Sequence, residues 1–376
     1  MKKIQRRITT LLFIVIIILL PLITLFSKKE KFSELENRSL QGKPRFSFSG
    51  WFDKSFMSDF ESFISDHFAG RVKWINIKIN TELAVGKNEI NGIYVTDERL
   101  IEKINDPDYD KIDSSTDAIN KFAQSVNVPV YTMIVPTSAG IYSEILPENA
   151  PQINQKELIG YINNKFDTGI SVIDIYDFLY AMKDDYIYYR TDHHWTSLGA
   201  YCAYSVAIQK LGFNSIAYSK FNIEHASSEF YGTYFSKTLC DKIRPDTIDI
   251  YTYNEGSSVV SCTQNNGLTT EKYKDIYFRE YLEKKDKYSM YLGTNISEVK
   301  IKTNLESDKK ILIFKDSYAN SFIPFLTQHY NEIEVLDMRY INNYRDYVDP
   351  DDYSQILFLY NSTTFCDDDN IRKLAY

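Results

Sequence analysis

Short apolar runs recur in the chain from about residue 86 onward, and segments long enough to form helices separate them. These runs are rich in Val, Ile, Phe and Tyr, and most of them place several apolar residues next to one another. Strands of this kind are buried on both faces. Because helical segments lie between them, the pattern predicts an α/β fold with a parallel sheet. The predicted strands lie in INGIYV, VPVYTMIVP, SVIDIYDFL, KKILIFKDS, NEIEVLDMR and SQILFLYN.

Three of these predicted strands end in side chains that can bind or react with a ligand. Asp316 and Ser317 end one strand, Arg339 follows the next, and Asn361 ends the last. In parallel α/β sheets, ligands bind beyond the carboxyl ends of the strands. We therefore expect these residues to lie at one edge of the sheet and to form part of a candidate site.

The N-terminus carries a membrane signal. Four cationic side chains in MKKIQRR precede Ile8–Phe26, which carries no charge and approaches the ~20 apolar residues that span a bilayer. No small-residue cleavage pattern follows, so an uncleaved single-pass anchor is favoured over a signal peptide. The positive-inside rule favours a cytoplasmic N-terminus, which would place the rest of the chain outside the cell membrane.

The sequence pattern divides the chain into three parts. We expect a cytoplasmic stub and membrane anchor over residues 1–30, followed by a helical entry module over 31–85, where apolar residues recur three to four positions apart. Residues 86–376 form the expected α/β catalytic domain. Within it, residues 213–305 are polar and rich in Tyr and Lys, which is typical of an insertion beside the site.

Charge and cysteine content restrict the function. The formal net charge is −8, and no long basic run lies outside the N-terminus, so nucleic-acid binding is not expected. The cysteines form no C-x-x-C pair and no zinc-ligand spacing. We expect free thiols, although a disulfide between two of them is open outside the cell. The four are Cys202, Cys240, Cys262 and Cys366, and the possible pair is Cys240 with Cys262.

The segment YYRTDHHWTSLGAY, residues 188–201, is the strongest candidate for chemistry. If it is extended, Asp192 and His194 face the same side and His193 faces the other. A carboxylate that orients a histidine supplies two members of a nucleophilic triad. Ser317, where a predicted strand turns into a helix, supplies the third, and the helix N-terminus would face a developing oxyanion.

Two other interpretations of these residues stay open. Zinc needs three or four ligands, whereas His67, His225 and His329 show no helical H-x-x-x-H relation to the histidine pair, so no metal site is expected. Alternatively, the imidazoles could be buried structural groups, and Ser317 could be an ordinary helix N-cap.

The motifs TDHHWT and FKDSYANSF together resemble the DHHW family of bacterial extracytoplasmic proteins. That family is similar to the SGNH-hydrolase-like domains of the alginate O-acetylation proteins. The resemblance implies a three-layer α/β/α sandwich with Ser317 as nucleophile, His194 as general base and Asp192 as its orienting carboxylate. The D-x-H spacing departs from the D-x-x-H of most SGNH esterases, and here the acid–base pair precedes the serine.

The resemblance also implies a function. It suggests a membrane-anchored, extracytoplasmic O-acetyltransferase that modifies a cell-surface or secreted polysaccharide, needs no cofactor, and receives acetyl groups from a membrane-bound O-acyltransferase partner. A carbohydrate O-acetylesterase and a non-catalytic polysaccharide-binding scaffold are the alternatives. Further candidates for binding the oxyanion or substrate are Asn361, Arg339, Tyr318 and Tyr142, although a turn-forming Asn, a surface Arg and a core Tyr are equally ordinary.

Overall fold

The computed structural model describes residues 2–375, and its contacts divide the chain into two units. The smaller unit contains the chain up to Asn91 together with Phe235–Lys242. The larger unit contains Gly92–Tyr234 and the described chain from Ile243 onward.

An eight-stranded sheet forms the centre of the larger unit, with the strand order β11-β10-β12-β14-β13-β15-β6-β7. The five strands from β14 to β7 are parallel to their neighbours. The other three extend the sheet in antiparallel fashion from β14. A mostly parallel sheet is therefore confirmed. The strands are β6 (Val130–Val135), β7 (Ile170–Val172), β10 (Val259–Asn265), β11 (Thr270–Tyr273), β12 (Glu298–Thr303), β13 (Lys310–Lys315), β14 (Glu332–Leu336) and β15 (Gln355–Asn361).

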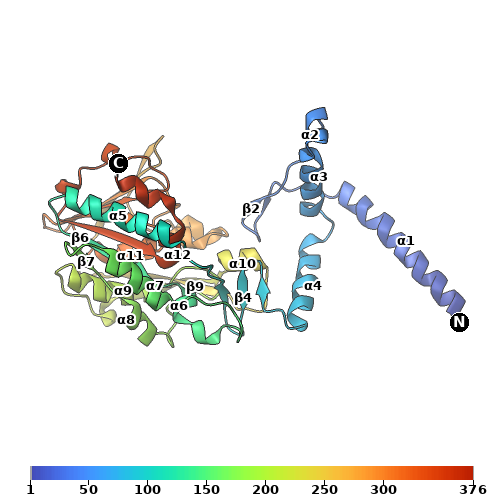
Figure 1. The fold of residues 1–376 in the computed structure, drawn as a ribbon, viewed down its shortest axis with the longest axis horizontal. Coiled ribbons are helices and arrows are strands. Elements are labelled where there is room, and N and C mark those ends of the chain that lie inside the picture. The colour runs from blue at the N-terminus through green and yellow to red at the C-terminus, as the bar shows by residue number, and fades with distance from the viewer. Residues whose placement is uncertain (1, 376) are drawn as a thin grey trace. The chain divides into compact units, whose positions relative to one another are not determined.

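Helices cover both faces of this sheet, which confirms the three-layer sandwich. In β13, Ile311 and Ile313 pack into one core, and Leu312 and Phe314 pack into the core on the opposite face. Figure 1 shows α5 and α9 on opposite sides of the sheet. The first core includes residues of α8 (Tyr176–Ala181), α9 (Ser197–Lys210) and α11 (Ala319–Leu326). The second includes residues of α5 (Tyr109–Ser125), α7 (Gln155–Lys165), α12 (Ser362–Asp367) and η7 (Asp369–Ala375).

Two of the predicted strands differ in detail from the structure. Within the INGIYV run, Ile93–Val95 forms β4, which pairs antiparallel with β5 (Leu100–Glu102) and not with the main sheet, whereas Ile90 ends the two-residue strand β3 (Glu89–Ile90). In SVIDIYDFL, the strand ends at Val172 and a helix begins at Tyr176, because this apolar run is shared between a strand and a helix. Residues 213–305 supply β10, β11 and β12, so part of this segment belongs to the main sheet.

Side-chain caps fix where several helices begin. The Thr196 side chain accepts a hydrogen bond from Gly199 N at the start of α9, and Asn361 accepts one from Thr364 N at the start of α12. Such a cap typically stabilises a helix by about 1 kcal/mol. The cap at Thr196 thus sets the start of α9 immediately after the 188–195 segment.

The remaining elements that include residues of the larger unit are short. The strands β8 and β9 form a separate antiparallel pair. Their bounds and those of the short helices are β8 (Asn222–Phe230), β9 (Asp246–Thr252), α6 (Ser138–Ile141), α10 (Thr233–Thr238), η1 (Ser143–Ile145), η2 (Tyr218–Lys220), η3 (Arg279–Glu283), η4 (Lys287–Met290), η5 (Tyr344–Asp346) and η6 (Pro350–Asp352). The four cysteines in residues 2–375 are buried and have free thiols.

The smaller unit is mostly helical. Its helix α1 contains a span, Lys3–Phe26, that is long and apolar enough to cross a membrane, as an anchor or a signal sequence would be. The Thr24 hydroxyl of α1 accepts a hydrogen bond of 3.0 Å from Ala69 N, which ties the end of α1 to the turn before α4. The elements are α1 (Lys2–Phe26), β1 (Phe32–Ser33), β2 (Arg38–Ser39), α2 (Phe48–Phe52), α3 (Ser55–Asp66), α4 (Arg71–Ala84) and β3 (Glu89–Ile90).

Candidate active site

Residues 188–196 form a tight loop whose two ends are held together by backbone hydrogen bonds. Tyr189 N donates to His194 O at 3.2 Å, and Thr196 N donates to Ile187 O at 2.9 Å. Tyr188 and Trp195 face each other as an isolated antiparallel bridge. The loop between them is therefore fixed at its base.

Asp192, His194 and Ser317 form a continuous line of hydrogen bonds. His194 Nδ1 lies 2.6 Å from Asp192 Oδ1, and His194 Nε2 lies 2.7 Å from Ser317 Oγ. Asp192 and His194 are buried, whereas Ser317 is half-buried. When Nδ1 donates to the carboxylate, Nε2 is left to accept the serine proton, which is the arrangement that a nucleophilic triad requires.

The carboxylate of Asp192 is held ionised inside the protein. Burial alone would raise its pKa, but electrostatic interactions with the His193 and His194 rings, together with hydrogen bonds from His194 and Thr233 N, hold the pKa of Asp192 well below its usual range. Asp192 Oδ1 also accepts from His194 N at 3.0 Å, and Oδ2 accepts from Thr233 N at 2.7 Å. Asp192 is therefore a fixed negative charge beside the imidazole.

Gly232 allows the chain to pass directly against Asp192. A Cβ on Gly232 would lie 2.3 Å from both Cβ and Oδ2 of Asp192, so no side chain fits there. No pattern in the sequence marks this glycine as a site residue, because only the three-dimensional fold brings it beside Asp192. The close approach is what places Thr233 N on the carboxylate.

Trp195 and Tyr318 tie the loop to the serine. Trp195 Nε1 donates to Tyr318 O and to Ser321 Oγ, both at 3.0 Å. The Tyr318 hydroxyl donates to His193 O. Tyr318, proposed from the sequence as a substrate-binding residue, is fully buried, and its hydroxyl serves this loop contact.

Tyr288 supports the imidazole from one face. Its ring is stacked on that of His194, with centroids 3.6 Å apart and planes 9° apart. Its hydroxyl donates to Ser317 O at 3.0 Å and lies 3.1 Å from Ser321 Oγ. Tyr288 comes from the 213–305 segment, and nothing local in the sequence distinguishes it from the other tyrosines of a chain that contains 30.

The position of His193 corrects the sequence-based expectation. The rings of His193 and His194 lie 3.8 Å apart, and His193 Nδ1 lies 3.6 Å from Asp192 Oδ1. The two histidines do not point to opposite sides, because the segment is a series of bends and not an extended strand. Side-chain alternation holds only in a strand.

This proximity also bears on metal binding. One ligand atom from each of Asp192, His193 and His194 lies within 4.8 Å of the others, a spacing that could hold a metal ion. In the described structure, however, His194 uses both ring nitrogens for Asp192 and Ser317. The expectation of no metal site stays a prediction.

Asn361 lies beside the serine turn, but its amide is already engaged. Its Nδ2 donates to Asp316 Oδ2 at 2.6 Å and to Thr364 Oγ1 at 2.8 Å. Burial raises the pKa of Asp316, although hydrogen bonds from Asn361 N and Tyr318 N oppose this. Asn361 thus links Asp316 to the start of α12, and it would have to release one of these bonds to stabilise an oxyanion.

Arg339 and Tyr142 occupy other surroundings. Arg339 Nε and Nη2 bind the two oxygens of Asp337 at 2.8 and 2.5 Å. Lys315 Nζ lies 3.8 Å from the same carboxylate, and burial lowers the pKa of Lys315 to about 8. Tyr142 is buried beneath the Arg99 guanidinium, which lies 3.6 Å from its ring centre. Among the contacts that the described residues make, none joins Arg339 or Tyr142 to Asp192, His194 or Ser317.

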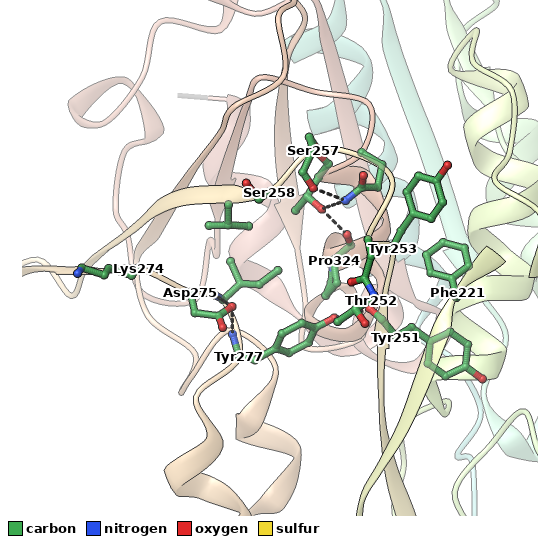
Figure 2. Close-up of a pocket in the computed structure, with 15 residues that line it drawn as sticks. Phe221, Tyr251, Thr252, Tyr253, Ser257, Ser258, Lys274, Asp275, Tyr277 and Pro324 are labelled. Atoms are coloured by element: carbon green, nitrogen blue, oxygen red, sulfur yellow. Dashed lines mark hydrogen bonds between the residues drawn. The ribbon is translucent and has the colours of Figure 1, made fainter.

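A separate cavity of about 290 Å³ lies in the larger unit. Figure 2 shows the rings of Phe221, Tyr251 and Tyr253 on one side of the view, with Asp275 and Lys274 on the other. None of the three triad residues lines it.

Comparisons with known proteins agree with this architecture. A family model described as "DHHW protein" matches residues 111–336, a range that contains Asp192, His194 and Ser317. No curated protein matches the sequence. A solved DHHW family protein from Eubacterium siraeum is 26% identical, with a TM-score of 0.67 over 76% of this chain and 95% of that chain.

Two structures of Bacillus cereus PatB1 share the fold. PatB1 is 24% identical, with a TM-score of 0.65 over 74% of this chain and 98% of that chain. PatB1 with a sulfonyl adduct is 21% identical, with a TM-score of 0.63 over 74% of this chain and 97% of that chain.

Proposed function

Because this chain belongs to the DHHW family, we propose that it is a membrane-anchored, extracytoplasmic O-acetyltransferase that forms an acyl-enzyme on Ser317. The hydrogen-bonded line from Asp192 through His194 to Ser317 carries this proposal. The proposed substrate class, a cell-surface or secreted polysaccharide, is supported by the similarity of the DHHW family to the alginate O-acetylation proteins.

The geometry supports a two-step acyl transfer. Ser317 Oγ attacks the carbonyl carbon of an acetyl ester while His194 Nε2 takes the serine proton. The tetrahedral intermediate collapses, the ester C–O bond breaks, and His194 gives the proton to the leaving oxygen. A sugar hydroxyl then attacks acetyl-Ser317, its proton passes to His194, and collapse returns that proton to Ser317 Oγ. Asp192 stabilises the imidazolium in both steps.

The Ser317 backbone N–H is the first candidate donor to the oxyanion. It lies where β13 leads into α11, and donors at helix N-termini stabilise developing negative charge. The next two N–H groups are engaged, since Tyr318 N donates to Asp316 Oδ1 at 2.9 Å and Ala319 N donates to Asp316 O at 3.3 Å. A second donor would come from Asn361 if its amide turns away from Asp316.

The same triad would hydrolyse the ester if water replaced the sugar hydroxyl, so a carbohydrate O-acetylesterase is the second candidate. The half-buried position of Ser317 admits either acceptor. The membrane location rests on α1, and a membrane-bound O-acyltransferase partner would supply the acetyl groups. The proposed mechanism needs no cofactor.

Covalent labelling tests the proposal. We expect a fluorophosphonate probe to modify Ser317 of the full-length protein in detergent, and peptide mass spectrometry to locate the adduct there. Ser317→Ala should abolish the adduct, whereas Ser228→Ala, at an exposed serine of β8, should not. An unlabelled but folded protein would refute the acyl-enzyme. Products formed from an activated acetyl ester with and without oligosaccharide would separate transfer from hydrolysis.

A further inference from the structure

Five aromatic side chains gather on one surface of the smaller unit. We define this aromatic cluster as Phe46, Phe48, Trp51, Phe56 and Phe60. The ring of Phe46 lies 5.6 Å from that of Phe48, 6.2 Å from Trp51 and 5.3 Å from Phe56. Phe56 lies 6.2 Å from Phe60 in a stacked arrangement. The cluster is therefore a contiguous apolar patch and not a set of scattered side chains.

Most of this aromatic cluster is open to the surroundings. Phe48 is 76% exposed, Phe46 58%, Trp51 53% and Phe60 44%. The adjacent Phe52 is 82% exposed. Contiguous exposed apolar patches on folded proteins mark surfaces that contact a membrane or another protein. The larger, α/β unit buries its large aromatic residues far more completely, as its two cores show.

The smaller unit also contains α1, which is able to cross a membrane, and this favours a membrane as the surface that the aromatic cluster contacts. Leu25 and Phe26, at the end of α1, are 66% and 87% exposed. The bond between Thr24 Oγ1 and Ala69 N fixes this end of α1 to the α3–α4 turn. Lys29 Nζ lies 5.8 Å from the centre of the Phe63 ring, which belongs to the same helix as Phe60. If α1 spans a bilayer, the aromatic cluster is held near the bilayer surface.

The chemistry of the cluster suits that surface. Trp and other aromatic side chains are enriched at membrane–water interfaces, where one part of the ring meets hydrocarbon and another meets water. Lys43, Arg45 and Lys54 flank the aromatic residues in the sequence, and cations next to an apolar face favour anionic headgroups.

We propose that the aromatic cluster inserts into the headgroup region of the outer leaflet and braces the extracytoplasmic part of the chain against the membrane. This inference rests on the part of the proposed function that places α1 in the bilayer. It is independent of the chemistry at Ser317. The brace would restrict where the smaller unit lies relative to the membrane surface, beyond what a single flexible tether provides.

Tryptophan fluorescence tests this in the full-length chain reconstituted into vesicles of phosphatidylcholine and phosphatidylglycerol. The chain contains Trp51, Trp74 and Trp195, and Trp195 is fully buried in the larger unit. In a Trp74→Phe background, we expect lipids brominated close to the headgroup to quench Trp51. We also expect the emission maximum of Trp51 to lie at a shorter wavelength than that of a tryptophan exposed to water.

Matched variants show whether the cluster is responsible. Phe48→Ser combined with Phe52→Ser should reduce the quenching of Trp51. Leu268→Ser, which removes an equally exposed apolar side chain from the larger unit, should leave the quenching unchanged. Circular dichroism of each variant reports that the chain is folded, without relying on the chemistry at Ser317.

Two results would overturn the inference. The first is an unquenched Trp51 while α1 resists carbonate extraction. Because these vesicles contain no other protein, that result would show that the aromatic cluster faces water or binds a protein partner instead of lipid. The second is extraction of the chain by carbonate, which would remove α1 from the bilayer. Neither result depends on whether Ser317 is labelled, so failure of this inference and failure of the acyl-enzyme are distinguishable.

Discussion

Replacing Gly232 with alanine should disable the candidate site without altering any of the three triad side chains. The alanine Cβ would lie 2.3 Å from Cβ and Oδ2 of Asp192. Non-bonded carbon atoms settle at about 3.5–4.0 Å, so the two residues must separate by about 1.2 Å or more. The strain of such overpacking typically costs about 1–3 kcal/mol of folding stability.

The same displacement reaches the imidazole. If Asp192 moves by about 1.2 Å away from Gly232, its 2.6 Å bond to His194 Nδ1 can lengthen to about 3.8 Å, which is beyond hydrogen-bonding range. If the backbone at Gly232 moves instead, the 2.7 Å bond from Thr233 N to Asp192 Oδ2 is lost. A misplacement of about 1 Å can cost about 100-fold in rate, so we expect a loss of that order.

The assay is the pre-steady-state burst with an activated acetyl ester, measured alongside urea unfolding of the same preparation. Gly160→Ala is the matched control, because a Cβ there meets no atom within 4 Å and the residue lies in α7, remote in sequence from both motifs. This control should keep its activity and stability. A Gly232→Ala protein with an unchanged burst rate and unchanged unfolding would refute the argument that Gly232 sets the position of Asp192.

Four other predictions follow from the site and its surroundings. Ser317→Ala and His194→Ala should each abolish the burst in that assay, and Asp192→Ala should leave slower turnover, because the carboxylate orients the ring but takes no proton. Tyr288→Leu should cost about 1 kcal/mol, a several-fold loss of rate, through the lost ring stacking, whereas Tyr288→Phe should keep that part of the rate. Burial lowers the pKa of His329 from 6.5 to about 4. The folding stability that depends on a neutral His329 is fully present above pH 6.5 and should be lost as the pH falls from 6.5 through 4, by up to about 3 kcal/mol. His329→Gln should therefore flatten the dependence of urea unfolding on pH between 6.5 and 4. Chelators should leave the acetyl-ester activity unchanged, and a loss that zinc restores would assign the histidine pair to a metal.

The sheet could be predicted from the sequence because its strands carry their own signal. Strands such as β13 and β15 are apolar at every position between their ends, since both faces are covered by helices. INGIYV is also mostly apolar, but its Ile93–Val95 part forms a short antiparallel strand outside the main sheet. A short apolar run shows that a segment is buried, whereas its pairing partner depends on residues far away in the chain.

The site was predictable to the extent that its members lie near recognisable elements. Ser317 follows a strand, and Asp192 and His194 are close neighbours in a motif. Gly232 and Tyr288 are missing from that prediction because they act through contacts with residues distant in the sequence. Gly232 lies 40 positions after Asp192, and Tyr288 lies 94 positions after His194. Backbone geometry also matters: the i, i+2 rule assumed a strand at 192–194, where the chain bends.

The motif around the histidine pair connects the proposed general base, His194, to the proposed nucleophile, Ser317, as well as supplying the base. Asp192 and His194 alone would leave the distance to Ser317 dependent on how α9 and α11 pack on the sheet. Trp195 reduces this dependence by donating to Tyr318 O, in the turn at Ser317, and to Ser321 Oγ in α11. Tyr318 returns a hydrogen bond to His193 O. Because these bonds join segments on either side of both reacting groups, the 2.7 Å separation of His194 and Ser317 is set locally, and small movements of the surrounding helices need not disturb it.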